Sequence, residues 1–144
     1  MVVLQRSSPG IGDAVMMQPL IERLSQDNHG DFGLVTKFPD LFKGMYPLHD
    51  TPPEFAEVID VGDPCPCSRY ENETKKIGKG RVQLFLEHCG YGYNGQTPEL
   101  KLTPEELSLS EEIKKEHGVQ IGLSTTSATY RNKLDGWRAV SYTH

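Results

Sequence analysis

The sequence predicts an α/β fold in which an open, mainly parallel sheet is flanked by helices. Its first six residues form a run rich in valine and leucine, as in a buried parallel strand. A turn containing glycine and proline follows at 7–13, and an amphipathic helical repeat comes next. A strand, a tight turn, a helix and a second strand, in this order, open a βα-type sheet.

The first predicted helix covers residues 14–26. Met16, Leu20 and Leu24 recur at intervals of four residues, and polar residues occupy the other side. Pro19 falls within this repeat and lacks the N–H group that would donate to residue 15. We therefore expect a kink in the helix at this point.

The elements predicted after this helix alternate between strands and helical segments. Short apolar runs at 32–36 and 58–61 predict the second and third strands. The stretches around them predict a short helix or turn at 39–44, a long surface loop at 62–80, a helix at 81–89 and an extended connector at 90–102.

The region after residue 102 predicts one more helix and the beginning of a second domain. Thr103 is the expected cap, Pro104 the first helical position, and acidic residues follow in the first turn. Apolar residues at 119–123 predict a further strand, which a polar loop and a helix start follow. Because such a unit cannot bury its own sheet face, the sequence predicts a first domain at 1–117 and a truncated second domain at 118–144.

Composition and charge bear on the partners and the location that we expect for the protein. The chain carries 15 basic and 20 acidic residues, a formal net charge of −5, whereas nucleic-acid-binding domains normally present a basic face. No apolar run approaches the roughly 20 residues of a membrane-spanning helix, and the N-terminus lacks the features of a signal peptide. We therefore expect a cytoplasmic protein with no nucleic-acid partner.

Three cysteines in a chain without an export signal indicate reduced thiols. Cys65, Cys67, His88 and Cys89 offer four zinc ligands on paper, which leaves a zinc-stabilised interaction module as one interpretation. Their spacing is not one of the usual zinc spacings, so we expect no metal.

The turn at 7–13 is the candidate site, because open α/β sheets bind ligands at the carboxyl ends of their strands. Ser8, Gly10 and Gly12 would form a loop around an acceptor or a phosphate, since glycines let backbone N–H groups approach a ligand closely. Asp13 is either the N-cap of the helix or a general base acting on a hydroxyl nucleophile.

Residues 6–20, RSSPGIGDAVMMQPL, resemble the N-terminal signature of the heptosyltransferases, glycosyltransferase family 9. The likeness continues more loosely through PELKLTPEE at 98–106 and GLSTTS at 122–127. The resemblance implies a GT-B fold, in which two Rossmann-like domains face each other across a cleft. It also implies inverting transfer of a heptose-like sugar from a nucleotide-sugar to a glycan or lipopolysaccharide-core acceptor, without a cofactor or an essential metal.

By the same resemblance, residues 1–117 are the acceptor-side domain and Asp13 is the acid that deprotonates the acceptor hydroxyl. The donor diphosphate would meet a loop of the second domain, comprising Ser124, Thr125, Thr126, Ser127 and either Arg131 or Lys133. Lys133 stands farther from Trp137 than the basic residue of the family does from its tryptophan, so the choice between the two stays open. A glycolipid acceptor would bring the protein to the membrane surface.

The residues leave a second function open, a non-catalytic Rossmann-like domain that holds a nucleotide or phosphate at the 7–13 turn. The Asp13→Asn substitution separates the two functions of Asp13. If Asp13 is the base, we expect this change to abolish transfer with little loss of stability.

Overall fold

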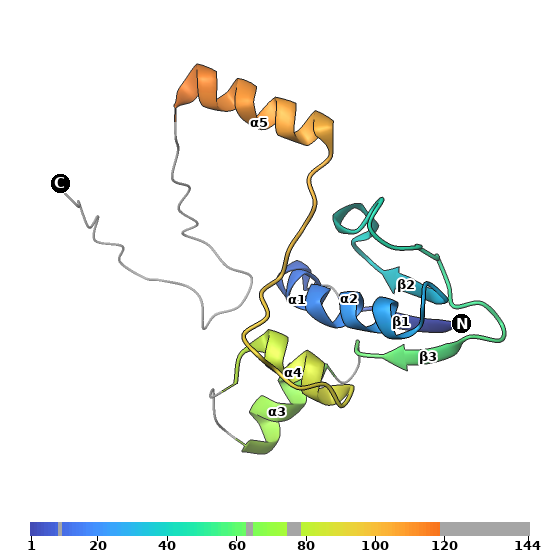
Figure 1. The fold of residues 1–144 in the computed structure, drawn as a ribbon. Helices are drawn as coiled ribbons and strands as arrows, with labels where there is room; N and C mark the ends of the chain where they lie inside the picture. The colour runs from blue at the N-terminus through green and yellow to red at the C-terminus, as the bar shows by residue number, and fades with distance from the viewer. Residues whose placement is uncertain (9, 63–64, 75–78, 119–144) are drawn as a thin grey trace. The chain divides into compact units, whose positions relative to one another are not determined.

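The computed structural model describes residues 1–8, 10–62, 65–74 and 79–118 (Figure 1). They fall in two compact units, Met1–Lys101 and Leu102–His144. The boundary between the units, after Lys101, lies before the helix at Pro104–His117, which the sequence predicted to belong to the first domain. Because the second unit runs into residues outside the described ranges, the predicted domain boundary at 117 stays a prediction.

The first unit contains a three-stranded parallel sheet in the order β2-β1-β3, with β1 at Val2–Arg6, β2 at Phe32–Thr36 and β3 at Glu57–Asp60. Val3 and Leu4 point to opposite faces of β1, and both are fully buried, as expected of a central strand. The predicted α/β fold with a parallel sheet and the three predicted strands are confirmed.

The first predicted helix is two helices, α1 at Ile11–Met16 and α2 at Gln18–Asp27. The interruption at Met17 precedes Pro19, which occupies the first turn of α2, so the expected kink is observed as a one-residue interruption between two helices. The helix also begins three residues earlier than predicted, since Gly10 is its N-cap and residues 11–13 of the predicted turn are already helical.

A helix in the predicted loop at 62–80 is the main correction to the sequence analysis. This helix, α3 at Pro66–Thr74, packs against α4 at Arg81–His88, and α4 in turn packs against α2 (Figure 1). Pro66 had indicated a loop, but at the first helical position its missing N–H costs nothing. The helix at 81–89 and the 3-10 turn, η1 at Pro39–Leu41, are confirmed.

The core of this unit lies between the sheet and its helices. Its fully buried members include Leu4, Leu20, Leu34, Phe42 and Phe85. In the second unit, α5 at Pro104–His117 begins with Thr103 in a reciprocal capping box with Glu106, as its predicted cap requires. No helix within the described ranges is long and apolar enough to cross a membrane.

Candidate active site at the end of β1

The candidate site lies at the carboxyl ends of β1 and β3. The chain leaves β1 for β2 on one side of it and returns for β3 on the other, which is where open α/β sheets leave a crevice. The two loops that follow these strands touch. A Cβ at Gly62 would lie 2.9 Å from the backbone nitrogen of Ser7, so only glycine allows this approach.

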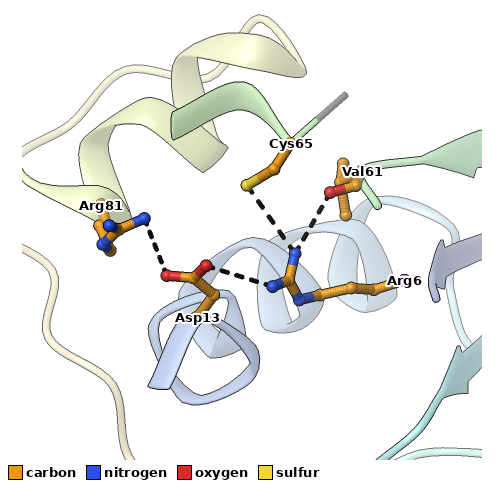
Figure 2. Close-up of polar contacts among 5 residues, drawn as sticks. All are labelled: Arg6, Asp13, Val61, Cys65 and Arg81. Atoms are coloured by element: carbon orange, nitrogen blue, oxygen red, sulfur yellow. Dashed lines mark hydrogen bonds and ion pairs between the residues drawn. The ribbon is translucent and has the colours of Figure 1, made fainter. Parts of the chain in front are cut away.

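Arg6, the last residue of β1, occupies the centre of the site although its side chain is only 2% exposed. Its Nη1 donates to the carbonyl oxygen of Val61 at 3.4 Å and to Cys65 Sγ at 3.8 Å (Figure 2). Its Nη2 donates to Asp13 Oδ2 at 3.2 Å, and its guanidinium carbon lies 5.8 Å from the ring centroid of Phe85. A buried cation of this kind requires charged and polar partners, and these are what surround it.

Asp13 lies in the first turn of α1, between two guanidinium groups (Figure 2). Oδ2 accepts from Arg6, and Oδ1 lies 3.0 Å from Nη1 of Arg81, the first residue of α4. The Asp13 side chain is 23% exposed and that of Arg81 is 44% exposed. The N-cap interpretation of Asp13 is wrong, because Gly10 occupies that position; Asp13 instead ties β1, α1 and α4 together.

The other predicted loop residues, Gly10, Ser8 and Gly12, differ in how closely they approach Arg6 and Asp13. A Cβ at Gly10 would lie 3.4 Å from both Arg6 Nη2 and Asp13 Oδ2, so a larger residue there would crowd the ion pair. Ser8 Oγ is buried and finds no hydrogen-bond partner among the described residues. Gly12 is exposed, and a Cβ there would meet no atom of the described chain within 4 Å.

Cys65 and Cys67 bring two thiols to the same site. Hydrogen bonds from the Cys67 side chain, from the backbone N–H groups of Cys67 and Ser68, and from Arg6 together hold the pKa of Cys65 well below its ordinary value, against the opposing effect of burial. The same hydrogen bond to Cys65 raises the pKa of Cys67, and burial adds to the effect. Both shifts arise from the same hydrogen bond, in which Cys67 donates its S–H group and Cys65 accepts.

The structure does not assemble the four zinc ligands that the sequence offered. Cys65 and Cys67 lie at the carboxyl end of the sheet, whereas His88 and Cys89 line a cavity with Val2, at the start of β1. Within the described ranges, which include all four, no three His, Cys, Asp or Glu side chains are grouped to hold a metal ion.

A cavity of about 630 Å³ lies between α2 and the connector at 91–99, and Asp13 is not among its lining residues. Tyr91 lines it and packs against the core, and the guanidinium of Arg23 lies 5.5 Å from the Tyr91 ring centroid. The Gln18 side chain holds the connector by accepting from the backbone N–H of Glu99 at 3.0 Å.

The predicted donor residues, Ser124 to Ser127, Arg131 and Lys133, lie outside the described residues. What the described part defines is an α/β chain with a parallel sheet and a cluster of charged side chains at the end of its central strand. No family model matches the sequence, and searches of curated proteins and of solved structures also found no match.

Sequence reasoning missed Arg6 and Arg81 as members of the site. Arg6 carried a signal, because a charged residue that ends an otherwise buried central strand must find partners at the carboxyl edge. Arg81 carried a weaker one, since a basic residue in the first turn of a helix opposes the helix dipole and so points to an acidic neighbour.

Proposed function

We propose that this chain is the acceptor-side part of a heptosyltransferase-like glycosyltransferase. It would transfer a sugar from a nucleotide-sugar, with inversion, to a glycan or lipopolysaccharide-core acceptor. The observation that carries the proposal is the Asp13 carboxylate, held at the carboxyl end of the central parallel strand by two guanidinium groups (Figure 2). The motif at 6–20 that resembles the family supplies this residue, its partner Arg6 and the strand on which they depend.

In this proposal Asp13 accepts the proton of the attacking hydroxyl group. Oδ2 faces the buried Arg6, whereas Oδ1 faces Arg81, whose side chain is 44% exposed. The acceptor hydroxyl would therefore approach Oδ1 and replace or share the contact with Arg81. Arg6 fixes the carboxylate in one orientation, which a general base needs because proton transfer requires hydrogen-bond distance to the nucleophile.

The balance of charge around Arg6 favours a neutral acceptor at this site. Around Arg6 and Arg81, the Asp13 carboxylate and the Cys65 sulfur, whose pKa is held below its ordinary value, offset the two guanidinium charges. A polyhydroxylated sugar suits such a site better than a phosphate, which would face Asp13 at close range. The donor, by contrast, would bind residues of the predicted second domain, and a cytoplasmic location with contact to the membrane through a glycolipid acceptor belongs to the same proposal.

A transfer assay on the complete reading frame that contains these residues tests the proposal. Candidate nucleotide-sugars and acceptor glycans are incubated with the wild-type protein and with the Asp13→Asn and Asp40→Asn variants. Asp40 is the matched control, since it is an exposed carboxylate on η1. We expect Asp13→Asn to lower kcat by about 100-fold or more and Asp40→Asn to leave it unchanged. Transfer that survives Asp13→Asn within a few-fold would overturn the role of Asp13.

A phosphate-binding domain without catalysis is the second candidate, and one observation favours it. Ser8 Oγ, in the turn, and Arg6 Nε, just before it, are both buried without a hydrogen-bond partner among the described residues. Two hydrogen-bond donors are therefore left for a phosphate. Titration with inorganic phosphate and with a nucleoside diphosphate, followed by the amide resonances of Gly10 and Gly12, separates the two functions. Saturable shifts at these amides without any transfer activity would replace the first proposal with the second.

A further inference from the structure

Cys65 occupies the N-cap position of α3. Its carbonyl oxygen accepts the first helical hydrogen bond, from the backbone nitrogen of Arg69 at 3.0 Å, and Pro66 is the first helical residue. Its sulfur accepts the N–H groups of Cys67 and Ser68, the bonds that a Ser, Thr or Asp side chain makes at a usual N-cap. A thiolate makes these bonds better than a thiol because it carries the negative charge that the helix N-terminus favours.

A buried cation lies on the other side of the same sulfur. Arg6 Nη1 is 3.8 Å from Cys65 Sγ, and the Arg6 side chain is 2% exposed (Figure 2). Arg6 also has a donor to spare, since its buried Nε has no partner among the described residues. The sulfur therefore faces fixed N–H donors and a positive charge. The carboxylate of Asp13, which lies on the other side of the Arg6 guanidinium, is held by Arg6 and Arg81.

The second thiol of the pair is protonated and adjacent. Cys67 donates its S–H to Cys65, and it is fully buried inside the first turn of α3. Because the Cys67 side chain is hydrogen-bonded to that of Cys65, the two sulfur atoms lie next to each other, as a disulfide between them requires. Cys65 is thus placed as the nucleophile of the pair, and Cys67 is the thiol that can react with Cys65 once Cys65 is oxidised.

We propose that Cys65 and Cys67 form a peroxide-reactive site in which Cys65 is oxidised first and Cys67 then closes a disulfide with it. The Cys65 thiolate attacks one oxygen of hydrogen peroxide, the O–O bond breaks, and a sulfenic acid and hydroxide form. The Cys67 sulfur attacks the sulfenic sulfur, the S–O bond breaks, and water leaves with the Cys67 proton. Overall, one thiolate and one thiol are oxidised to a disulfide, and one peroxide is reduced to one hydroxide ion and one water.

The same chain contains an internal control in Cys89. Burial raises the pKa of Cys89 to about 11, so it carries little thiolate at neutral pH. Cys89 is half-buried, whereas Cys65 is 9% exposed, so exposure alone would make Cys89 the more reactive thiol. Faster reaction at Cys65 would therefore report its electrostatic surroundings and not its accessibility.

Mass spectrometry after a limited peroxide pulse at pH 7 tests the proposal. Trypsin places Cys65 and Cys67 together on residues 44–69 and Cys89 on residues 82–101, so the two sites are read separately. We expect the 44–69 peptide to lose two hydrogen atoms, at a rate about 10-fold or more above any oxidation of Cys89. In Cys67→Ser the sulfenic acid should persist and react with dimedone at Cys65. Cys65→Ser should leave Cys67 unoxidised, and Cys89→Ser should behave as the wild type.

Two outcomes would overturn the proposal. Oxidation of Cys89 before Cys65 would show that the helix N-terminus and Arg6 do not activate the sulfur. A persistent sulfenic acid in the wild-type protein, without a disulfide, would remove Cys67 from its role. The order of cysteine oxidation and the formation of the disulfide do not depend on sugar transfer. The proposed function can therefore fail while this inference stands, and this inference can fail while the proposed function stands.

Discussion

The guanidinium group of Arg6 lies 3.2 Å from the carboxylate of Asp13, and this contact joins the end of β1 to the first turn of α1. Arg6 is buried, and Asp13 is the carboxylate that compensates its charge, whereas Asp13 also contacts the more exposed Arg81. One carboxylate therefore has two duties, to neutralise a buried cation and, in the proposed function, to accept a proton.

The first prediction concerns the stability of Asp13→Asn. The sequence alone suggested little loss, but an amide at this position leaves the buried Arg6 without its carboxylate partner. We expect the free energy of unfolding to fall by about 1–3 kcal/mol, less than for a fully buried pair because Asp13 is 23% exposed. Urea denaturation measures the change, with Asp40→Asn as the control that should remain within about 0.5 kcal/mol of the wild type.

The stability of Asp13→Asn also decides the temperature at which its activity is assayed. If Asp13→Asn lowers the midpoint of unfolding, kcat must be measured at a temperature where the variant is fully folded. Arg81→Gln provides a second comparison, because it removes the partly exposed ion pair and leaves the one to Arg6. A loss of stability in Arg81→Gln equal to that in Asp13→Asn would contradict the leading role assigned to Arg6.

The second prediction compares two glycines. A Cβ at Gly33, in β2, would lie 2.6 Å from the ring of His49, whereas at Gly12, in α1, it would meet nothing within 4 Å of the described chain. Gly33→Ala should therefore destabilise the protein by about 1–3 kcal/mol through overpacking, and Gly12→Ala should be neutral or stabilise α1 by about 0.5–1 kcal/mol. Thermal unfolding of both variants checks the pair, and an equal effect at the two positions would contradict the packing of His49 over Gly33.

The sequence predicted the regular elements well where one local signal dominates. The apolar run before Arg6 and the cap at Thr103 each define their element without help from distant residues, and the structure confirms both. Prediction failed at α3, since Cys65 acts as the cap and cysteine is not among the usual capping residues.

The site was only partly predictable for a different reason. Asp13 follows the first strand closely in sequence, so its position at the carboxyl edge could be inferred. Arg81 and Cys65 reach Asp13 and Arg6 only because α3 and α4 return to the end of β1, a tertiary arrangement that no local pattern encodes. The predicted donor loop after residue 118 stays a prediction.

The third prediction concerns the cap of α5. Thr103 Oγ1 accepts from the backbone nitrogen of Glu106 at 3.2 Å, and the Glu106 carboxylate accepts from the backbone nitrogen of Thr103 at 2.7 Å. Thr103→Ala should therefore cost α5 about 1 kcal/mol. Hydrogen exchange of the α5 amides should quicken by about fivefold, as that free energy implies. Thr97→Ala, in the connector, is the control; equal acceleration in both variants would show that the cap does not stabilise α5.

The last prediction is the pH dependence of thiol alkylation. Only the thiolate reacts, so the alkylation rate follows the fraction of thiolate. Below the pKa of a thiol this rate rises about 10-fold per pH unit, and above the pKa it is constant. Cys89, whose pKa burial raises, should follow the steep line between pH 6 and 9. Cys65 lies beside Arg6, the Cys67 S–H and the start of α3, and Asp13 and Arg81 are further charged groups among the described residues around the pair. We expect Cys65 to react with iodoacetamide at a nearly constant rate above about pH 7. Arg6→Met should move the Cys65 profile toward higher pH, since it removes a positive charge that favours the thiolate. Parallel steep profiles at Cys65 and Cys89 would mean that neither Arg6 nor the helix N-terminus holds a thiolate at this site.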